Sequence, residues 1–102
     1  MNFDNTIKKL REKYPNRIPV IIETNQKDLN ISKKKYLVPK DYTVRDFQNI
    51  IRNKLDLNNS ESIYIYCKNM MCLPSTTFLT IMEQQNNPSH LVLHYGKEET
   101  YG

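Results

Sequence analysis

The chain has 102 residues, and its 15 Lys and Arg against 11 Asp and Glu give a formal net charge of +4 at pH 7. A chain of this length forms one domain whose core needs no metal or disulfide support. No apolar run approaches the roughly 20 residues of a membrane span, and residues 1–5 lack the apolar core of a signal peptide. We therefore expect a cytoplasmic protein whose two cysteines are reduced.

The positive charge limits the classes of partner. Proteins that bind nucleic acids usually combine such charge with a recognisable reading motif, and this sequence has none. We therefore expect no nucleic-acid partner. An acidic protein or an anionic membrane surface suits a mild positive charge equally well.

An amphipathic helix is the first element that the sequence predicts. Phe3, Ile7 and Leu10 recur at the spacing of one helix face. Pro15 ends this pattern because proline disrupts a helix interior. We expect residues 1–14 to form an N-terminal helix with one apolar face.

Two apolar stretches then predict an antiparallel pair of strands with a long connection. Residues 17–23 form a near-continuous apolar run, which is typical of a strand covered on both faces. Residues 24–32 are polar and predict a loop. Residues 35–38 form the second, shorter strand, which Pro39 closes.

The second of these strands has the sequence features of an exposed sheet edge. Lysines at 33–35 and the closing proline discourage uncontrolled pairing with another chain. Since side chains alternate along a strand, Lys35 and Leu37 share one face, while Tyr36 and Val38 share the other. Two interpretations stay open: the edge is only protected, or it accepts one extended peptide as a further strand.

The second half of the chain alternates helices and strands. Thr43 precedes Asp46 by three residues as an imperfect capping box, and apolar residues then follow with a helical period to Leu55. The sequence further predicts strands at 63–67 and 70–71 joined by a turn at 68–69, a short helix at 78–84 and a last strand at 91–95. This order predicts an α+β fold with helices against one sheet and one parallel pair of strands near its centre.

Two cysteines and two histidines resemble the spacing of a zinc finger, but geometry argues against a metal site. Cys67 and Cys72 are followed at a distance by His90 and His94. If both histidines lie on a strand, their side chains are about 13 Å apart, whereas each ligand of one zinc ion lies ~2 Å from it. We expect no metal and no cofactor, with Cys67 as a small core residue.

Several blocks of the sequence resemble one known family. They are residues 14–21, residues 33–39, Thr43-Val44 with Phe47, Ile51-Arg52 and the final Tyr101-Gly102. From residue 14 onward the chain is similar to the autophagy ubiquitin-like modifiers of the GABARAP family. The resemblance implies a ubiquitin-like β-grasp core at 15–95, one added N-terminal helix and a flexible conjugation tail at 96–102.

The resemblance also implies how such a protein acts. Gly102 would be joined to phosphatidylethanolamine by activating and conjugating enzymes, and a cysteine protease would process and deconjugate the tail. Nothing within the chain would activate Gly102, so we expect no enzymatic activity. Receptors with a W/F/Y-x-x-L/I/V motif would be recruited to autophagic membranes.

The motif would bind in two pockets, which the resemblance assigns residue by residue. The pocket for the aromatic anchor would be lined by Leu10, Pro19, Ile21, Lys35 and Leu37, with Arg17 and Lys54 meeting acidic residues of the ligand and His90 at its side. The pocket for the aliphatic anchor would be lined by Tyr36, Val38, Pro39, Tyr42, Phe47 and Ile50. This division agrees with the alternation along the edge strand.

Three features depart from the pattern of the family. The segment before Tyr14 is too short for the two N-terminal helices usual in the family, so we expect only the inner one. The loop at 24–32 is shorter. His90 stands where the family usually has an aromatic residue, and we expect this histidine to make the first pocket pH-sensitive.

Two alternatives to a lipid-conjugated modifier stay open. One is a sister modifier joined to a lysine of a protein, and the other is a β-grasp interaction scaffold that is never conjugated. The lysine–tyrosine block at 33–36 favours the lipid-conjugated family. Such a protein would lie in the cytoplasm and, when lipidated, on the autophagosomal membrane.

Overall fold

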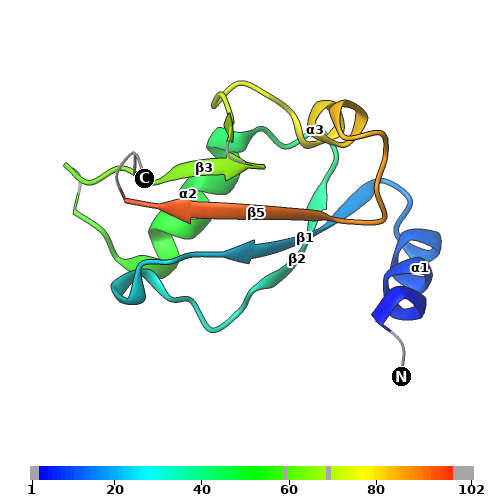
Figure 1. The fold of residues 1–102 in the computed structure, drawn as a ribbon, viewed down its shortest axis with the longest axis horizontal. Coiled ribbons are helices and arrows are strands. Elements are labelled where there is room, and N and C mark those ends of the chain that lie inside the picture. Colours follow the sequence, from blue (N-terminus) through cyan, green and yellow to red (C-terminus); the bar gives the residue numbers. More distant parts are fainter. Residues whose placement is uncertain (1–2, 59, 69, 98–102) are drawn as a thin grey trace.

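The computed structural model describes residues 3–58, 60–68 and 70–97, in the order shown in Figure 1. The helices are α1 (Phe3–Lys13), α2 (Val44–Leu55) and α3 (Phe78–Gln84), with a 3₁₀ helix η1 (Lys27–Leu29), and the strands are β1 (Arg17–Glu23), β2 (Lys35–Pro39), β3 (Tyr64–Cys67), β4 (Met70–Met71) and β5 (Leu91–Gly96). None of the helices in these segments is long and apolar enough to cross a membrane.

The strands form one mixed sheet of five strands in the order β2-β1-β5-β3-β4. β1 pairs antiparallel with β2 and parallel with β5, whereas β3 pairs antiparallel with both β5 and β4. The expected antiparallel pair and the expected parallel pair near the centre are both confirmed. β2 lies at one edge of the sheet, as its lysines and proline predicted (Figure 1).

The main core lies between the sheet and α2, which crosses behind the strands in Figure 1. Strand alternation places every second residue of β1 and β5 on this face, where the helical period of α2 presents its apolar stripe. The buried cluster includes Ile18, Val20, Ile22, Val44, Phe47, Ile51, Leu91 and Leu93. Together with the mixed sheet, this packing confirms the predicted α+β class.

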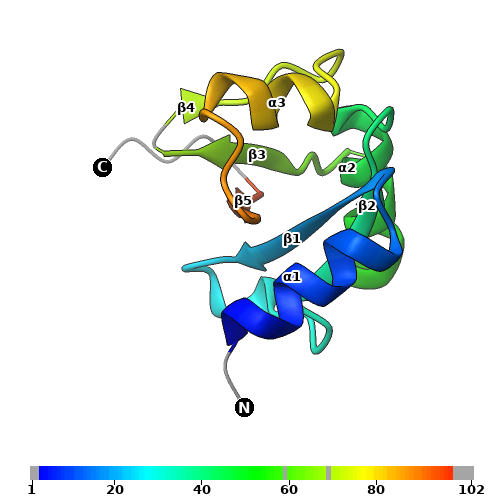
Figure 2. The ribbon, with the colours of Figure 1, turned by 90° about the vertical axis from the view of Figure 1, so that its right-hand side faces the viewer.

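α1 packs on the face of β1 that lies away from α2. Figure 2 shows α1 running alongside β1. Ile7 of α1 is buried and does not belong to the main core cluster. Pro19 is buried too, although it alternates with the core residues of β1. α1 therefore covers part of the outer sheet face, next to the open edge of β2.

A reciprocal cap fixes the start of α2. Thr43 Oγ1 accepts a hydrogen bond from the Asp46 backbone N–H at 3.2 Å, and the Thr43 N–H donates to Asp46 Oδ2 at 3.0 Å. The capping box that the sequence predicted is thus complete, with Asp in place of the usual Glu. The helix ends at Asp56, whose φ of 55° is left-handed.

The segment at 24–32 differs from the predicted loop. It contains η1, and Leu29 and Ile31 are buried with exposed fractions of 1% and 7%. The Tyr95 hydroxyl donates a hydrogen bond to the Leu29 carbonyl at 2.7 Å, so the segment is fastened to β5. Two isolated apolar residues in a polar stretch have no periodicity, and the sequence pattern therefore missed their burial.

The remaining predicted elements agree closely with the structure. α3 has the predicted bounds, and the last strand is one residue longer than predicted. Cys67 is buried as expected. The predicted turn at 68–69 begins at Lys68 with a φ of 52°, while Asn69 lies outside the described residues.

Candidate functional site

β2 has one neighbour in the sheet, β1, and its other side is an open edge. The Ile22 backbone N–H donates to the Lys34 carbonyl at 2.9 Å, so the position of Lys34 faces β1. In an antiparallel ladder the backbone groups of the next residue, Lys35, and of Leu37 point to the opposite side. The Leu37 carbonyl there accepts a hydrogen bond from Arg17 Nη1 at 3.4 Å. An extended ligand would meet the backbone of Lys35 and Leu37 along this edge.

A cavity of about 610 Å³ lies beside this edge, between α1 and the outer face of β1 and β2. Its floor and walls are mostly apolar, and its charged residues are all cationic. The residues that line it are Thr6, Ile7, Leu10, Arg17, Pro19, Val20, Ile21, Lys33, Lys35, Tyr36 and Leu37. An aromatic side chain with acidic neighbours matches both the apolar surface and the charge of this cavity.

Most of the residues predicted for the first pocket line this cavity. Leu10, Arg17, Pro19, Ile21, Lys35 and Leu37 all contribute to it. The prediction did not include Ile7, which lies one helical turn before Leu10 on the same face and could have been found from that spacing. It also omitted Thr6, Val20 and Lys33, and it assigned Tyr36 to the second pocket only.

Lys54 and His90 are absent from the lining of this cavity. Lys54 belongs to α2, on the other side of the sheet, and its Nζ lies 5.9 Å from the centroid of the Tyr36 ring. His90 lies just before β5, where its Nδ1 and the Ser89 hydroxyl are 2.8 Å apart in a hydrogen bond. The predicted part of both residues in the first pocket stays a prediction.

Tyr36 joins the cavity to the core. Its hydroxyl donates to the Lys33 carbonyl at 2.9 Å, and the Lys33 ammonium lies 5.0 Å from its ring centroid. Burial raises the pKa of the Tyr36 hydroxyl, and the nearby Tyr95 raises it further, so this group remains a neutral donor. Lys33 and Lys54 thus place two positive charges near one aromatic ring.

The residues predicted for the second pocket gather around Tyr36 and differ in accessibility. Phe47 is completely buried, with its ring edge-to-face against Tyr36 and Phe78 at centroid distances of 5.4 Å. Val38 is also buried. Tyr42 is 37% exposed, and three residues are partly exposed: Tyr36, Pro39 and Ile50. A ligand would therefore touch the partly exposed residues, with Phe47 as support below them.

The site has the chemistry of a binding surface. The polar side chains of the cavity are those of Thr6, Arg17, Lys33, Lys35 and Tyr36, and no His, Cys, Asp or Glu lines it. Within 3–58, 60–68 and 70–97, no three such residues are grouped so that they could hold a metal ion. Burial raises the pKa of the Cys72 thiol to about 11, which disfavours the thiolate that a metal requires.

The predicted conjugation residue, Gly102, lies outside the described residues. The last described residue is Lys97, which follows β5 directly. The structure therefore fixes the point from which residues 98–102 start.

A five-stranded mixed sheet packed on one long helix, with a parallel central pair, defines a ubiquitin-like protein. The N-terminal helix α1 is an addition to this ubiquitin-like core. The family model described as "Autophagy protein Atg8 ubiquitin like" matches residues 3–102.

Individual relatives agree with this match. The chain is 37% identical over 98 residues to autophagy-related protein 8c of Arabidopsis thaliana, covering 92% of this chain and 82% of the relative. It is 38% identical over 97 residues to autophagy-related protein 8 of Schizosaccharomyces pombe, covering 92% and 80%. The crystal structure of Trypanosoma brucei ATG8 is similar with a TM-score of 0.83 at 26% identity, over 97% of this chain and 88% of that one. The chain belongs to the Atg8 family of ubiquitin-like autophagy proteins.

Proposed function

We propose that this protein is a modifier without enzymatic activity that recruits receptors through the β2 edge and is conjugated through Gly102 to phosphatidylethanolamine. The proposed receptors carry a W/F/Y-x-x-L/I/V motif. The observation that supports this proposal best is the open edge of β2 beside a cationic, apolar cavity of about 610 Å³. The family match adds that such proteins act in autophagy.

The motif suits the edge because its two anchors are three residues apart. In an extended peptide, side chains three residues apart point to opposite faces, and the two predicted pockets lie on opposite faces of β2. In an extended peptide, the aromatic anchor would enter the cavity, and the aliphatic anchor would reach the partly exposed surface around Tyr36 and Ile50. Backbone groups between the anchors would pair with Lys35 and Leu37. Acidic residues beside the aromatic anchor would lie near Arg17 and Lys33.

The expected affinity is micromolar. Each buried anchor contributes roughly 1.5–3 kcal/mol and each backbone hydrogen bond about 1 kcal/mol net, against association and ordering costs of several kcal/mol. A W-x-x-L peptide titrated into ¹⁵N-labelled protein should shift the amide signals of residues 17–21 and 33–39. The same peptide with both anchors changed to alanine is the control. Shifts confined to β3 and β4 would refute the proposed binding site.

Conjugation needs catalysis that the partners supply. We propose that the activating enzyme joins the Gly102 carboxylate to AMP from ATP, with loss of pyrophosphate, and that an enzyme cysteine then displaces AMP to form a thioester. The thioester passes to the conjugating enzyme, and the lipid amine displaces the cysteine thiol to form the amide. A cysteine protease processes and deconjugates the tail. Glycine suits the C-terminal position because it has no Cβ to obstruct a narrow active site. The proposed division is an N-terminal helix at 1–14, a β-grasp core at 15–95 and a conjugation tail at 96–102.

Mass spectrometry of the cellular protein tests the conjugation. A phosphatidylethanolamine adduct on Gly102 is the expected result, together with a cytoplasmic pool and a pool on autophagosomal membranes. An isopeptide adduct with a protein lysine, or a free carboxylate alone, would each refute lipid conjugation. In a reconstituted reaction, Gly102→Ala should block adduct formation and leave binding of the W-x-x-L peptide unchanged.

A further inference from the structure

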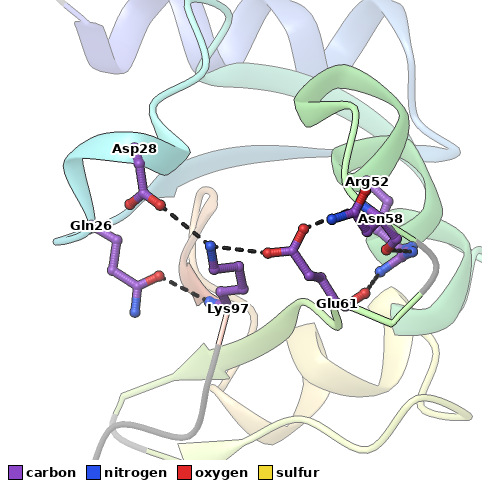
Figure 3. A network of polar contacts seen from close by, with 6 residues as sticks. All are labelled: Gln26, Asp28, Arg52, Asn58, Glu61 and Lys97. Carbon is purple, nitrogen blue, oxygen red and sulfur yellow. Dashed lines mark hydrogen bonds and ion pairs between the residues drawn. The ribbon is translucent and has the colours of Figure 1, made fainter.

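β5 ends at Gly96, and the next residue is held by two loops that are distant in the sequence (Figure 3). The Lys97 backbone N–H donates to Gln26 Oε1 at 3.0 Å. The Lys97 ammonium lies 3.4 Å from Asp28 Oδ2 and 3.0 Å from Glu61 Oε2. We name these four residues, Gln26, Asp28, Glu61 and Lys97, the C-terminal clasp.

The Glu61 side of the clasp is fixed to the end of α2. Glu61 Oε1 accepts a hydrogen bond from the Asn58 N–H at 3.2 Å. Arg52, in the last turn of α2, donates to the carbonyls of both Glu61 and Asn58, the latter at 3.0 Å (Figure 3). The Glu61 carboxylate that pairs with Lys97 is therefore held in place by other hydrogen bonds, and a fixed carboxylate favours one position of the Lys97 ammonium.

The Gln26 side of the clasp closes over Gly96. The Gln26 N–H donates to Thr24 Oγ1 at 3.1 Å, which holds the start of this loop. Gly96 is buried, and a Cβ at this position would lie 3.3 Å from Gln26 Nε2. Because Gly96 has no Cβ, the Gln26 amide has room beside it and can accept the hydrogen bond from the Lys97 N–H. Residues 96 and 97 are thus both ordered against the folded body.

The clasp limits where the C-terminal carbonyl can react. Gly102 lies five residues after Lys97. Five extended residues span at most about 18 Å. Any enzyme that takes Gly102 must therefore bring its active site within that distance of the clasp, at the end of the sheet where η1 and the loop before β3 meet.

We propose that Lys97 is a positioning residue for the reaction at Gly102, an inference that rests on the proposed function. An enzyme that binds the folded body together with the tail has to order every free residue between them. The clasp orders residues 96 and 97 before the enzyme arrives. Loss of the clasp therefore weakens binding of the chain to the enzyme. The rate of the reaction in the bound complex stays the same, because Gly102 lies five residues away from the clasp.

This role is separate from global stability. Ion pairs between partly exposed groups contribute little to folding, and the Lys97 side chain is 31% exposed. A change at Lys97 should therefore leave the melting temperature nearly unchanged. If such a variant reacts more slowly at Gly102 while its melting temperature is unchanged, the defect lies in the positioning of the C-terminal residues and not in folding.

The test measures initial rates of thioester formation between Gly102 and the activating enzyme, against the concentration of the full chain. Lys97→Met, which keeps most of the side-chain length and removes the charge, should raise KM three- to tenfold with kcat within twofold of wild type. Lys97→Arg should restore KM because it keeps the charge and reach. Lys40→Met, at the opposite end of the sheet, is the matched control and should behave as wild type.

A second measurement reports on the clasp without any enzyme. The ¹⁵N heteronuclear NOE of the Lys97 amide should match that of β5 in wild type and fall in Lys97→Met. An unchanged KM in Lys97→Met, or a loss confined to kcat, would overturn the inference while the proposed function stands. A wild-type chain that forms no thioester would instead overturn the proposed function, and with it the positioning role.

Discussion

Tyr36 and Phe47 stand edge-to-face, with ring centroids 5.4 Å apart and planes at 90°. Tyr36 lines the cavity beside β2, and Phe47 belongs to the buried face of α2. One aromatic contact therefore connects the ligand-binding edge to the centre of the core. The shape of the edge depends on the packing below it, because a buried ring that is removed leaves a space into which Tyr36 can move.

Phe47→Ala should lower the free energy of unfolding by about 3–5 kcal/mol, the usual cost of truncating a buried aromatic ring. The ring is completely buried and packs against both Tyr36 and Phe78, so its removal deletes apolar contacts on two sides. Urea unfolding followed by circular dichroism measures the change. A loss below about 1 kcal/mol would show that the site collapses around the smaller side chain.

Tyr95→Phe should destabilise the protein by about 1–2 kcal/mol, because the hydroxyl pairs with a carbonyl in a buried segment. The Tyr95 hydroxyl donates to the Leu29 carbonyl at 2.7 Å, and Leu29 is 1% exposed. Hydrogen exchange should accelerate in residues 27–31 more than in α2. If the exchange rates of residues 27–31 and of α2 increase by the same factor relative to wild type, the result would contradict a local role for this hydrogen bond.

The sequence predicted best what depends on local patterns. The helical period of α2 and its N-terminal capping residues lie within residues 43–55, and the alternation of β2 is visible in five residues. Both signals survive folding because tertiary packing here agrees with local preference. The two faces of the edge strand could therefore be derived from the pattern, whereas the residues of the cavity were assigned by the family resemblance.

What the sequence did not predict depends on distant segments that meet only in the fold. Leu29 is an apolar residue in a polar stretch, and its burial requires Tyr95 from β5. Lys97 meets Asp28 and Glu61, which are 69 and 36 positions away by residue number.

Leu37→Ala should weaken the W-x-x-L peptide about five- to twentyfold, which corresponds to ~1–2 kcal/mol of lost apolar contact with the aromatic anchor. Leu37 is half-buried and lines the cavity, so its truncation enlarges the pocket without opening the main core. Isothermal calorimetry measures the dissociation constant. Leu79→Ala removes an exposed leucine from α3 and is the matched control. Equal affinities of the two variants would exclude Leu37 from the site.

Cys72 should make the protein less stable at alkaline pH. Burial raises the pKa of its thiol to about 11, and the nearby Cys67 adds to this effect. In the unfolded chain a cysteine thiol has a pKa of about 8.5. Below that value both states are protonated, and the contribution of Cys72 to stability is complete. As the pH rises from about 8.5 to 11, the unfolded state loses its proton first, so the free energy of unfolding falls.

Other groups also contribute to the fall of the free energy of unfolding at high pH, and the experiment has to separate their contribution from that of Cys72. Burial raises the pKa of Tyr36 and of Tyr95, and both tyrosines act in the same direction at high pH. Cys72→Ala keeps both tyrosines, so the difference between wild type and this variant isolates the thiol. Urea unfolding at pH 8 and pH 10.5 should show a smaller loss of stability in Cys72→Ala than in wild type. Parallel losses in the two proteins would mean that the Cys72 thiol ionises as readily in the folded chain as in the unfolded one.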